Sequence, residues 1–159
     1  MLFSKIYVIN LVRRKDRRTQ VEATLNSANI PDSIPIEYIE AVDGQALPPD
    51  DTYNIIENFT DPGTDRVITT GEIGCGLSHQ LVFEKAYSEM SDGENILILE
   101  DDLAIDPYFM DEVEKIEIES KDIDFDFMYL GRKKVNEHAV EDRVSDSLVK
   151  PSYSYWTSS

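Results

Sequence analysis

Residues 95–102, Asn-Ile-Leu-Ile-Leu-Glu-Asp-Asp, constrain most strongly what this chain can fold into. The continuous apolar run at 96–99 is typical of a short strand that is buried on both faces of an α/β sheet. Three acidic residues, 100–102, follow this run without a spacer. Open α/β sheets bind ligands at the carboxyl ends of their strands. The stretch therefore predicts a ligand site at the end of a central strand.

The three acids allow two interpretations. Strand alternation would place Glu100 and Asp102 on one side of the chain and Asp101 on the other. Two carboxylates held on one side suit a hard divalent cation such as Mg²⁺ or Mn²⁺, which prefers oxygen ligands. Acids that follow a strand also often do no more than solvate a turn, and the triplet alone does not decide between the two. Three adjacent carboxylates repel one another, so we expect something to neutralise them.

Charge and length exclude several classes of function. A formal net charge of −17 argues against nucleic acid and anionic membranes as partners. A chain of 159 residues is expected to form one domain with a real hydrophobic core. No apolar run approaches the length of a transmembrane segment, and the first strand starts too early to leave room for a signal peptide. These features predict a cytoplasmic protein.

The single cysteine, Cys75, cannot form an internal disulfide, so nothing in the sequence demands an oxidising compartment. One cysteine and two histidines also leave no zinc site of the usual Cys/His spacing. His79 falls within a predicted helix, where a lone histidine is by default a hydrogen-bonded core or surface group.

Strand and helix patterns alternate along the chain, which predicts the α/β class with an open sheet. The expected elements, in order, are a strand at 5–11, a helix at 12–28, a strand at 36–42, an irregular stretch at 45–67, a helix at 70–90, the central strand, a helix starting at Pro107 and a strand at 124–131.

The two longer predicted helices carry the features that bear on a site. The first opens with five cations, which oppose the helix dipole and are either solvated or face an anionic ligand; we favour the ligand. The second begins with a capping box, Thr69 and Glu72. Its expected apolar stripe consists of Ile73, Leu77 and Leu81 and is extended by Val82, Ala86 and Met90. Each interior glycine costs this helix roughly 1 kcal/mol, which favours a close approach of the helix to a strand, with a nucleotide contact as the secondary interpretation. The cations are Arg13, Arg14, Lys15, Arg17 and Arg18, and the glycines are Gly71, Gly74 and Gly76.

Several stretches together resemble glycosyltransferase family 25, which includes lipopolysaccharide glycosyltransferases and procollagen galactosyltransferases. The most specific is Gly-Glu-Ile-Gly-Cys-x-x-Ser-His at 71–79, followed by the acidic triplet. The matches occur in the family's order along nearly the whole chain. The remaining ones are Ile-Tyr-Val-Ile-Asn-Leu at 6–11, Arg-Arg-Lys-Asp-Arg at 13–17, Ala-Val-Asp-Gly at 41–44 and Tyr-Leu-Gly at 129–131.

The resemblance implies a GT-A type, Rossmann-like open sheet with flanking helices. It also implies a metal-dependent transfer of galactose from a UDP-sugar, with inversion, to a hydroxyl of a glycan or of a hydroxylysine-type acceptor. Such reactions belong to lipopolysaccharide biosynthesis and collagen glycosylation. The family's domain normally continues past a stretch like Tyr155-Trp156. Residues 1–159 would therefore be the nucleotide-sugar-binding, N-terminal portion of a single glycosyltransferase domain that is incomplete at its C-terminus.

Site residues follow from the same resemblance. Glu100 and Asp102 would hold Mn²⁺ or Mg²⁺, with Asp101 in support and in contact with the donor. An inverting transfer also needs a general base near the acceptor hydroxyl, and the catalytic residue stays unassigned. The other residues expected near the nucleotide sugar are Asn10, Arg13, Arg17, Asp43 and His79.

Two other classes of function compete with this one. The Ile-Leu-Ile-Leu-Glu-Asp-Asp stretch is also similar to the first strand and acidic pocket of receiver domains. Only 57 residues follow Asp102, too few for the remaining sheet and for the phosphoacceptor and lysine of such a module. The second alternative is a non-catalytic GT-A remnant that binds a nucleotide sugar or a partner protein without transferring sugar.

Overall fold

A computed structural model describes residues 1–48, 66–131 and 141–151 of the chain. These residues fall into two compact units, Phe3–Pro107 in one and Met1–Leu2 with the residues from Tyr108 onward in the other. The first unit contains a small parallel sheet with flanking helices, so the predicted α/β class is confirmed.

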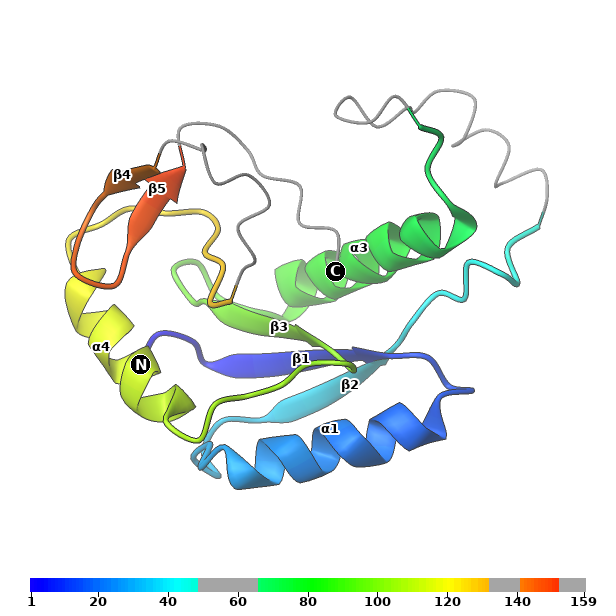
Figure 1. The fold of residues 1–159 in the computed structure, drawn as a ribbon, viewed down its shortest axis with the longest axis horizontal. Coiled ribbons are helices and arrows are strands. Elements are labelled where there is room, and N and C mark those ends of the chain that lie inside the picture. The colour runs from blue at the N-terminus through cyan, green and yellow to red at the C-terminus, as the bar shows by residue number, and fades with distance from the viewer. Residues whose placement is uncertain (49–65, 132–140, 152–159) are drawn as a thin grey trace. The chain divides into compact units, whose positions relative to one another are not determined.

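The sheet of the first unit has three parallel strands in the order β2-β1-β3 (Figure 1). Its central strand is β1 (Lys5–Asn10), in which every residue after Lys5 is buried. Next to it lie β2 (Ile36–Glu40) and β3 (Ile96–Glu100). The prediction that the apolar run at 96–99 is buried on both faces is wrong, because only Leu97 is buried. Among the described strands, β3 pairs with β1 alone and lies at an edge of the sheet.

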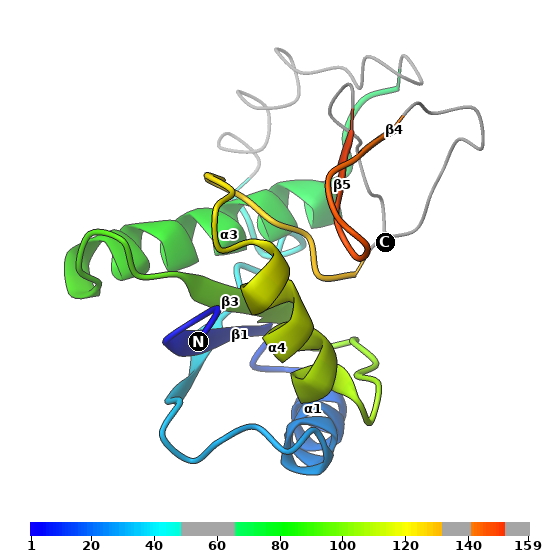
Figure 2. The same ribbon diagram turned by 90° about the vertical axis from the view of Figure 1, so that its left-hand side faces the viewer.

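Helices α1 (Lys15–Ser27) and α3 (Thr70–Glu89) cover opposite faces of this sheet, as Figures 1 and 2 show. Successive side chains of β1 point to opposite faces of the sheet. Tyr7 and Ile9 pack with Val82 and Ala86 of α3 in one buried cluster. The chain passes from β1 through α1 to β2, and then through α3 to β3 on the other side of β1. The direction of winding therefore reverses between β1 and β3.

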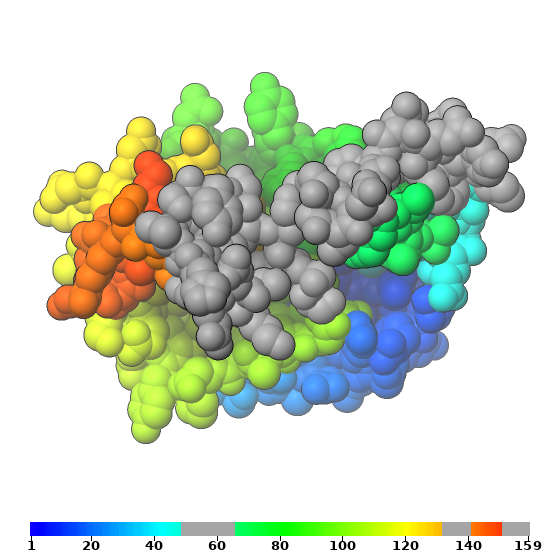
Figure 3. Space-filling model, turned by 45° about the horizontal axis from the view of Figure 1, so that its top comes forward, coloured from blue at the N-terminus to red at the C-terminus, as the bar shows by residue number. Residues whose placement is uncertain are grey.

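The start of α3 and its buried face can be compared with the prediction. The predicted capping box is present, with the Thr69 side chain accepting from Glu72 N–H and the Glu72 side chain accepting from Thr69 N–H. The predicted apolar stripe is confirmed at Ile73, Val82 and Ala86, which are buried, and is wrong at Leu81, which is 41% exposed. Side chains of the green helix α3 stand out from the surface in Figure 3. The buried residues of α3 are Ile73, Gly74, Ser78, Val82 and Ala86.

Two predicted helix starts are wrong by a few residues. Helix α1 begins at Lys15 rather than at residue 12, because a turn closed by Arg14 N–H and the Leu11 carbonyl comes first. In the second unit, α4 (Phe109–Glu119) begins after Pro107, since its first helical hydrogen bond joins Glu112 N–H to the Tyr108 carbonyl.

The strand predicted at 124–131 is absent, because this segment forms neither helix nor strand. Its Phe127 and Tyr129 are more than half exposed and pack edge to face against each other, so they bury no strand face. The second unit instead contains an antiparallel hairpin, β4 (Glu141–Arg143) and β5 (Val149–Pro151). Most of the irregular stretch at 45–67 and of the aromatic segment at 151–159 lies outside the described residues.

No helix in the described part of the chain combines the length and the hydrophobicity that crossing a lipid bilayer would require.

The amino end of the sheet carries a cluster of charges that predicts acid sensitivity. Lys5 Nζ lies 2.8 Å from Glu89 Oε2, Lys85 Nζ lies 2.6 Å from Glu89 Oε1, and the buried Tyr7 hydroxyl donates to Glu89 at 3.0 Å. Hydrogen bonds from Lys5, then Lys85 and Tyr7, lower the pKa of Glu89 from 4.5 to about 2. A carboxyl group whose pKa is lower in the folded state stabilises the fold above its unfolded-state pKa, and this stabilisation is lost as the pH falls.

We expect Glu89→Gln to flatten the pH dependence of the unfolding free energy between pH 4.5 and about 2, the interval between the two pKa values of Glu89. Urea denaturation at a series of pH values measures this dependence. Glu84→Gln, on the same helix, is the matched control and should keep the wild-type slope. An unchanged slope in Glu89→Gln would contradict the prediction.

Candidate functional site

The candidate site lies where β1 and β3 end side by side, at the point where the winding of the sheet reverses. Ligands of open α/β sheets bind at such switch points, outside the carboxyl ends of the strands. Asn10, the last residue of β1, donates its side-chain amide to Asp101 Oδ2 at 2.6 Å. Both side chains are buried, with Asp101 only 7% exposed. This hydrogen bond joins the ends of the two strands.

Arg17, in the first turn of α1, holds two of the three acids. Its Nη1 atom donates to Asp101 Oδ1 at 2.9 Å and to Asp102 Oδ2 at 3.0 Å. One guanidinium thus partly neutralises the negative charge of the three acids and reduces the repulsion expected between them. Three carboxylates and one arginine leave two formal negative charges, and the neighbouring Arg14 is paired with Asp16 at 2.7 Å. A residual charge of this size, on oxygen ligands, suits a divalent cation.

The third acid, Glu100, faces a different element. Its Oε1 atom lies 3.8 Å from Cys75 Sγ and 3.9 Å from His79 Nε2, both on α3. The predicted alternation, with Glu100 and Asp102 on one side, is wrong because β3 ends at Glu100 and the next two residues form a turn. Asp101 and Asp102 therefore share a partner, while Glu100 lies next to α3. Metal binding by Glu100 and Asp102 stays a prediction.

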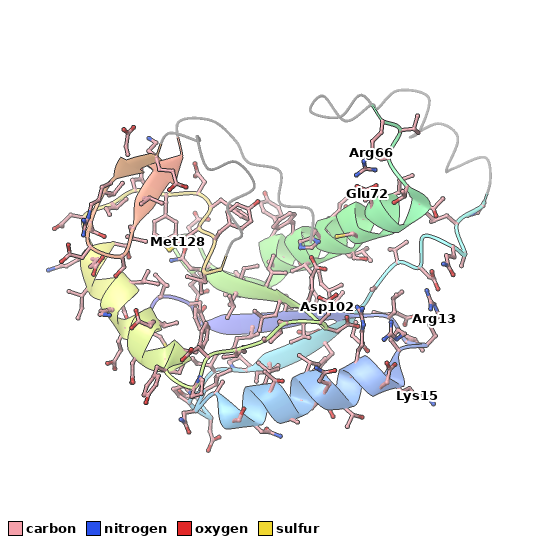
Figure 4. All side chains as sticks on the ribbon, viewed as in Figure 1. Arg13, Lys15, Arg66, Glu72, Asp102 and Met128 are labelled. Carbon is pink, nitrogen blue, oxygen red and sulfur yellow. The ribbon has the colours of Figure 1, made fainter. Side chains whose placement is uncertain are left out.

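Arg13 and Asp43 connect the segments that follow β1 and β2. Arg13 Nε donates to Asp43 Oδ2 at 2.5 Å, and Asp43 Oδ1 accepts from Gln45 N–H at 3.1 Å. The Arg13 guanidinium, helped by the Gln45 amide, lowers the pKa of the Asp43 carboxyl below its usual value. Figure 4 labels Arg13 and Asp102, which both lie toward the carboxyl end of the sheet. The ion pair holds an arginine at this edge.

The segment that carries Asp43 is fixed against α3 by very close backbone contacts. A Cβ atom on Gly44 would lie 1.8 Å from the Thr70 carbonyl oxygen, and one on Gly74 would lie 2.7 Å from the Val42 carbonyl oxygen. Ser78 Oγ donates to the Gly74 carbonyl at 2.6 Å and accepts from Val42 N–H at 2.9 Å. Of the three helix glycines, only Gly74 makes a close approach, and it meets Val42 and Gly44 in the segment after β2 rather than a strand. A Cβ atom on Gly76 would meet nothing within 4 Å.

Four of the five cations at the start of α1 divide into two pairs. Arg14 and Arg18 pair with acids of the same helix, Asp16 and Glu22, and Arg18 also stacks on the Tyr38 ring. Arg13 and Arg17 instead extend toward the pocket described next. Two of the predicted cations are therefore placed where an anionic ligand could meet them.

A pocket of about 190 Å³ brings six of the eight predicted site residues together. Asn10 does not line it, since it is buried against Asp101, and Asp102 is held by Arg17 outside the lining. Cys75 and Ser78 also line the pocket and were missed as site residues. Cys75 has a signal in the sequence, because it lies four residues before His79 and helical spacing places both on one face of α3. The six predicted residues are Arg13, Arg17, Asp43, His79, Glu100 and Asp101.

Comparison with known proteins identifies relatives along nearly the whole chain. Residues 3–153 match the sequence model of glycosyltransferase family 25, described as an LPS biosynthesis protein. The chain is 36% identical to a glycosyltransferase 25 family member of Aedes aegypti over 97% of its length, and 36% identical to procollagen galactosyltransferase 2 of Mus musculus over 99%. It is also 34% identical, over 98% of its length, to the human protein named inactive glycosyltransferase 25 family member 3. The chain spans about a quarter of the length of each of these relatives, 25%, 25% and 26%.

Proposed function

The chain belongs to glycosyltransferase family 25, and from this premise we propose that it binds a UDP-sugar and transfers galactose to a hydroxyl acceptor. We propose that its sheet is the first part of a GT-A type fold. The description of the family as an LPS biosynthesis protein, and the name of the mouse relative, procollagen galactosyltransferase 2, support an acceptor hydroxyl on a glycan or on a procollagen-type protein.

One observation carries this proposal: Arg17 bridges Asp101 and Asp102 at the switch point of the sheet, beside a pocket that Glu100 also lines. The two uncompensated carboxylate charges and their oxygen ligands fit Mn²⁺ or Mg²⁺, which Glu100 and Asp102 would hold. A divalent ion bound there would stabilise the negative charge that develops on the diphosphate leaving group.

The arginines of the pocket would bind the phosphates directly. Arg13 and Arg17 both line it, and a planar guanidinium forms paired hydrogen bonds with phosphate oxygens. Asp43 holds Arg13 in place, and Asp101 holds Arg17. The pocket, about 190 Å³, is smaller than the roughly 300–1,000 Å³ of complete small-molecule sites. We therefore assign it to the diphosphate part of the donor. Inversion would also need a general base, and none of the described residues is assigned to that role.

A second candidate function is binding without transfer. The human relative that is named inactive matches this chain almost as closely as the mouse galactosyltransferase does, at 34% against 36% identity. A chain of this kind would keep the nucleotide-binding edge of the sheet and lack sugar transfer.

Release of UDP from a panel of UDP-sugars tests the proposal, with Mn²⁺, with Mg²⁺ and with EDTA. Each reaction is run with and without a hydroxylysine-containing collagen peptide or a lipooligosaccharide acceptor. The proposed transferase would release UDP from UDP-galactose, faster with one acceptor, and only when a divalent ion is present. UDP binding without release would favour the second candidate. A chain that binds no UDP-sugar under any of these conditions would overturn both.

A further inference from the structure

Three potential metal ligands of different chemistry meet on the α3 side of the pocket. Cys75 and His79 lie one turn apart on α3, and Glu100 ends β3, 25 residues after Cys75. One ligand atom from each of the three lies within 4.8 Å of the other two. This cluster was not found from Cys/His spacing because its third ligand is a carboxylate from another element.

The orientation of His79 suits a metal ligand. Its Nδ1 atom lies 3.1 Å from the Cys75 carbonyl oxygen and 3.8 Å from Cys75 Sγ, and because a carbonyl oxygen can only accept a hydrogen bond, Nδ1 is the donor in that contact. In the neutral ring, Nε2 then has a free lone pair, and it faces Glu100 Oε1 at 3.9 Å. Metal-binding histidines are usually oriented in this way, with the non-coordinating nitrogen donating to a backbone carbonyl or carboxylate.

The two ligand separations that involve Glu100 are close to those of a tetrahedral ion. Zinc binds sulfur at about 2.3 Å and nitrogen or carboxylate oxygen at about 2.0–2.1 Å, so neighbouring ligand atoms in a tetrahedral site lie roughly 3.3–3.6 Å apart. Cys75 Sγ and His79 Nε2 lie 3.8 and 3.9 Å from Glu100 Oε1. A separation of 3.9 Å is too long for a hydrogen bond and leaves room for an ion between the two side chains.

We propose that Cys75, His79 and Glu100 form a site for a thiophilic divalent cation such as Zn²⁺, with its fourth position open to the pocket. A thiolate and an imidazole select zinc over the hard ions Mn²⁺ and Mg²⁺, which prefer an all-oxygen environment. Binding replaces the Cys75 S–H bond with an S–Zn bond and releases one proton to solvent. The site goes beyond the proposed transferase activity and shares Glu100 with it, so bound Zn²⁺ would oppose the use of Mn²⁺ at the acidic triplet.

Cobalt(II), a coloured substitute for zinc, tests this site in the full 159-residue chain. Cys75 is the single cysteine of the sequence, so any thiolate-to-cobalt charge-transfer band reports binding at this residue. We expect the band to appear with one equivalent of Co²⁺ and to disappear when one equivalent of Zn²⁺ is added. Cys75→Ser should abolish the band. Loss of one of the other ligands, in His79→Ala or Glu100→Gln, should weaken Co²⁺ binding by at least about tenfold.

Matched variants make the result specific. His138→Ala removes the other histidine of the sequence and should leave the Co²⁺ affinity unchanged. Circular dichroism of each variant establishes whether it is folded. If His79→Ala is unfolded, the Co²⁺ affinity of Glu100→Gln alone tests the contribution of the other ligands. The proposal is overturned if wild-type chain gives no charge-transfer band, or if the band and the Co²⁺ affinity persist in the folded ligand variants. Asp102→Ala should keep the band while losing metal-dependent UDP binding, so this site and the transferase proposal fail separately.

Discussion

Gly44→Ala should lower the free energy of unfolding by about 3 kcal/mol or more, a large fraction of the 5–15 kcal/mol typical of a domain. Its Cβ atom would lie 1.8 Å from the carbonyl oxygen of Thr70, a backbone atom that cannot rotate away. The segment after β2 would have to separate from α3, and the hydrogen bond from Val42 N–H to Ser78 Oγ would be lost with it. Urea denaturation followed by circular dichroism measures the change.

Gly76→Ala is the matched control for this prediction. Gly76 also belongs to the docked helix, but a Cβ atom there meets no atom within 4 Å. Alanine is favoured over glycine in a helix interior by roughly 1 kcal/mol, so this variant should be stabilised. The prediction is contradicted if the free energy of unfolding of Gly44→Ala lies within about 0.5 kcal/mol of the wild-type value. In that case, the segment that contains Asp43 does not pack closely on α3 in solution.

Asp101→Ala should destabilise the fold by about 2–4 kcal/mol. The substitution leaves the buried Asn10 amide without its carboxylate partner and removes one of the two acids that Arg17 holds. The Asn10 amide would keep only its long contact with the Arg14 carbonyl oxygen, at 3.4 Å. A buried donor that loses its main partner costs more than a broken surface ion pair. The unfolding free energy of the variant, measured in urea at neutral pH, gives the effect.

Asp102→Ala is the matched control, one residue along the same turn. Asp102 is 49% exposed and pairs with the same arginine, so its loss should cost less than about 1 kcal/mol. If Asp101→Ala and Asp102→Ala lower the free energy of unfolding equally, the special structural role assigned to Asp101 is wrong. The contrast separates a buried acid that holds the strand ends together from an exposed acid to which we assign only the proposed metal-binding role.

The sequence predicted the parts of the fold that depend on local pattern. The apolar runs at 5–11 and 96–99, the capping box of α3 and the acids after β3 all lie where the pattern placed them. The sequence did not reveal that β1, rather than β3, lies at the centre of the described sheet. Strand order follows from the path of the connections, and local hydrophobicity does not encode it.

The parts of the site that the sequence missed depend on contacts between elements. Gly74 and Ser78 lie on the buried face of α3 together with its apolar residues, and such small residues add nothing to an apolar stripe. Gly74 lets the backbone after β2 approach the helix closely. Alternation failed after Glu100 because it holds only while the strand continues. The Cys75, His79 and Glu100 cluster requires α3 and β3 to lie side by side, and spacing along the chain cannot show this.

We propose that the acidic residues at the end of β3 bind a divalent cation together with the diphosphate of a nucleotide. This proposal is tested by isothermal titration of UDP into the wild-type chain, with Mn²⁺ and with EDTA, and into Asp102→Ala with Mn²⁺. We predict saturable binding with Mn²⁺ that weakens at least about tenfold, or 1.4 kcal/mol, in EDTA and in the variant. UDP binding of equal affinity under all three conditions would contradict the claim.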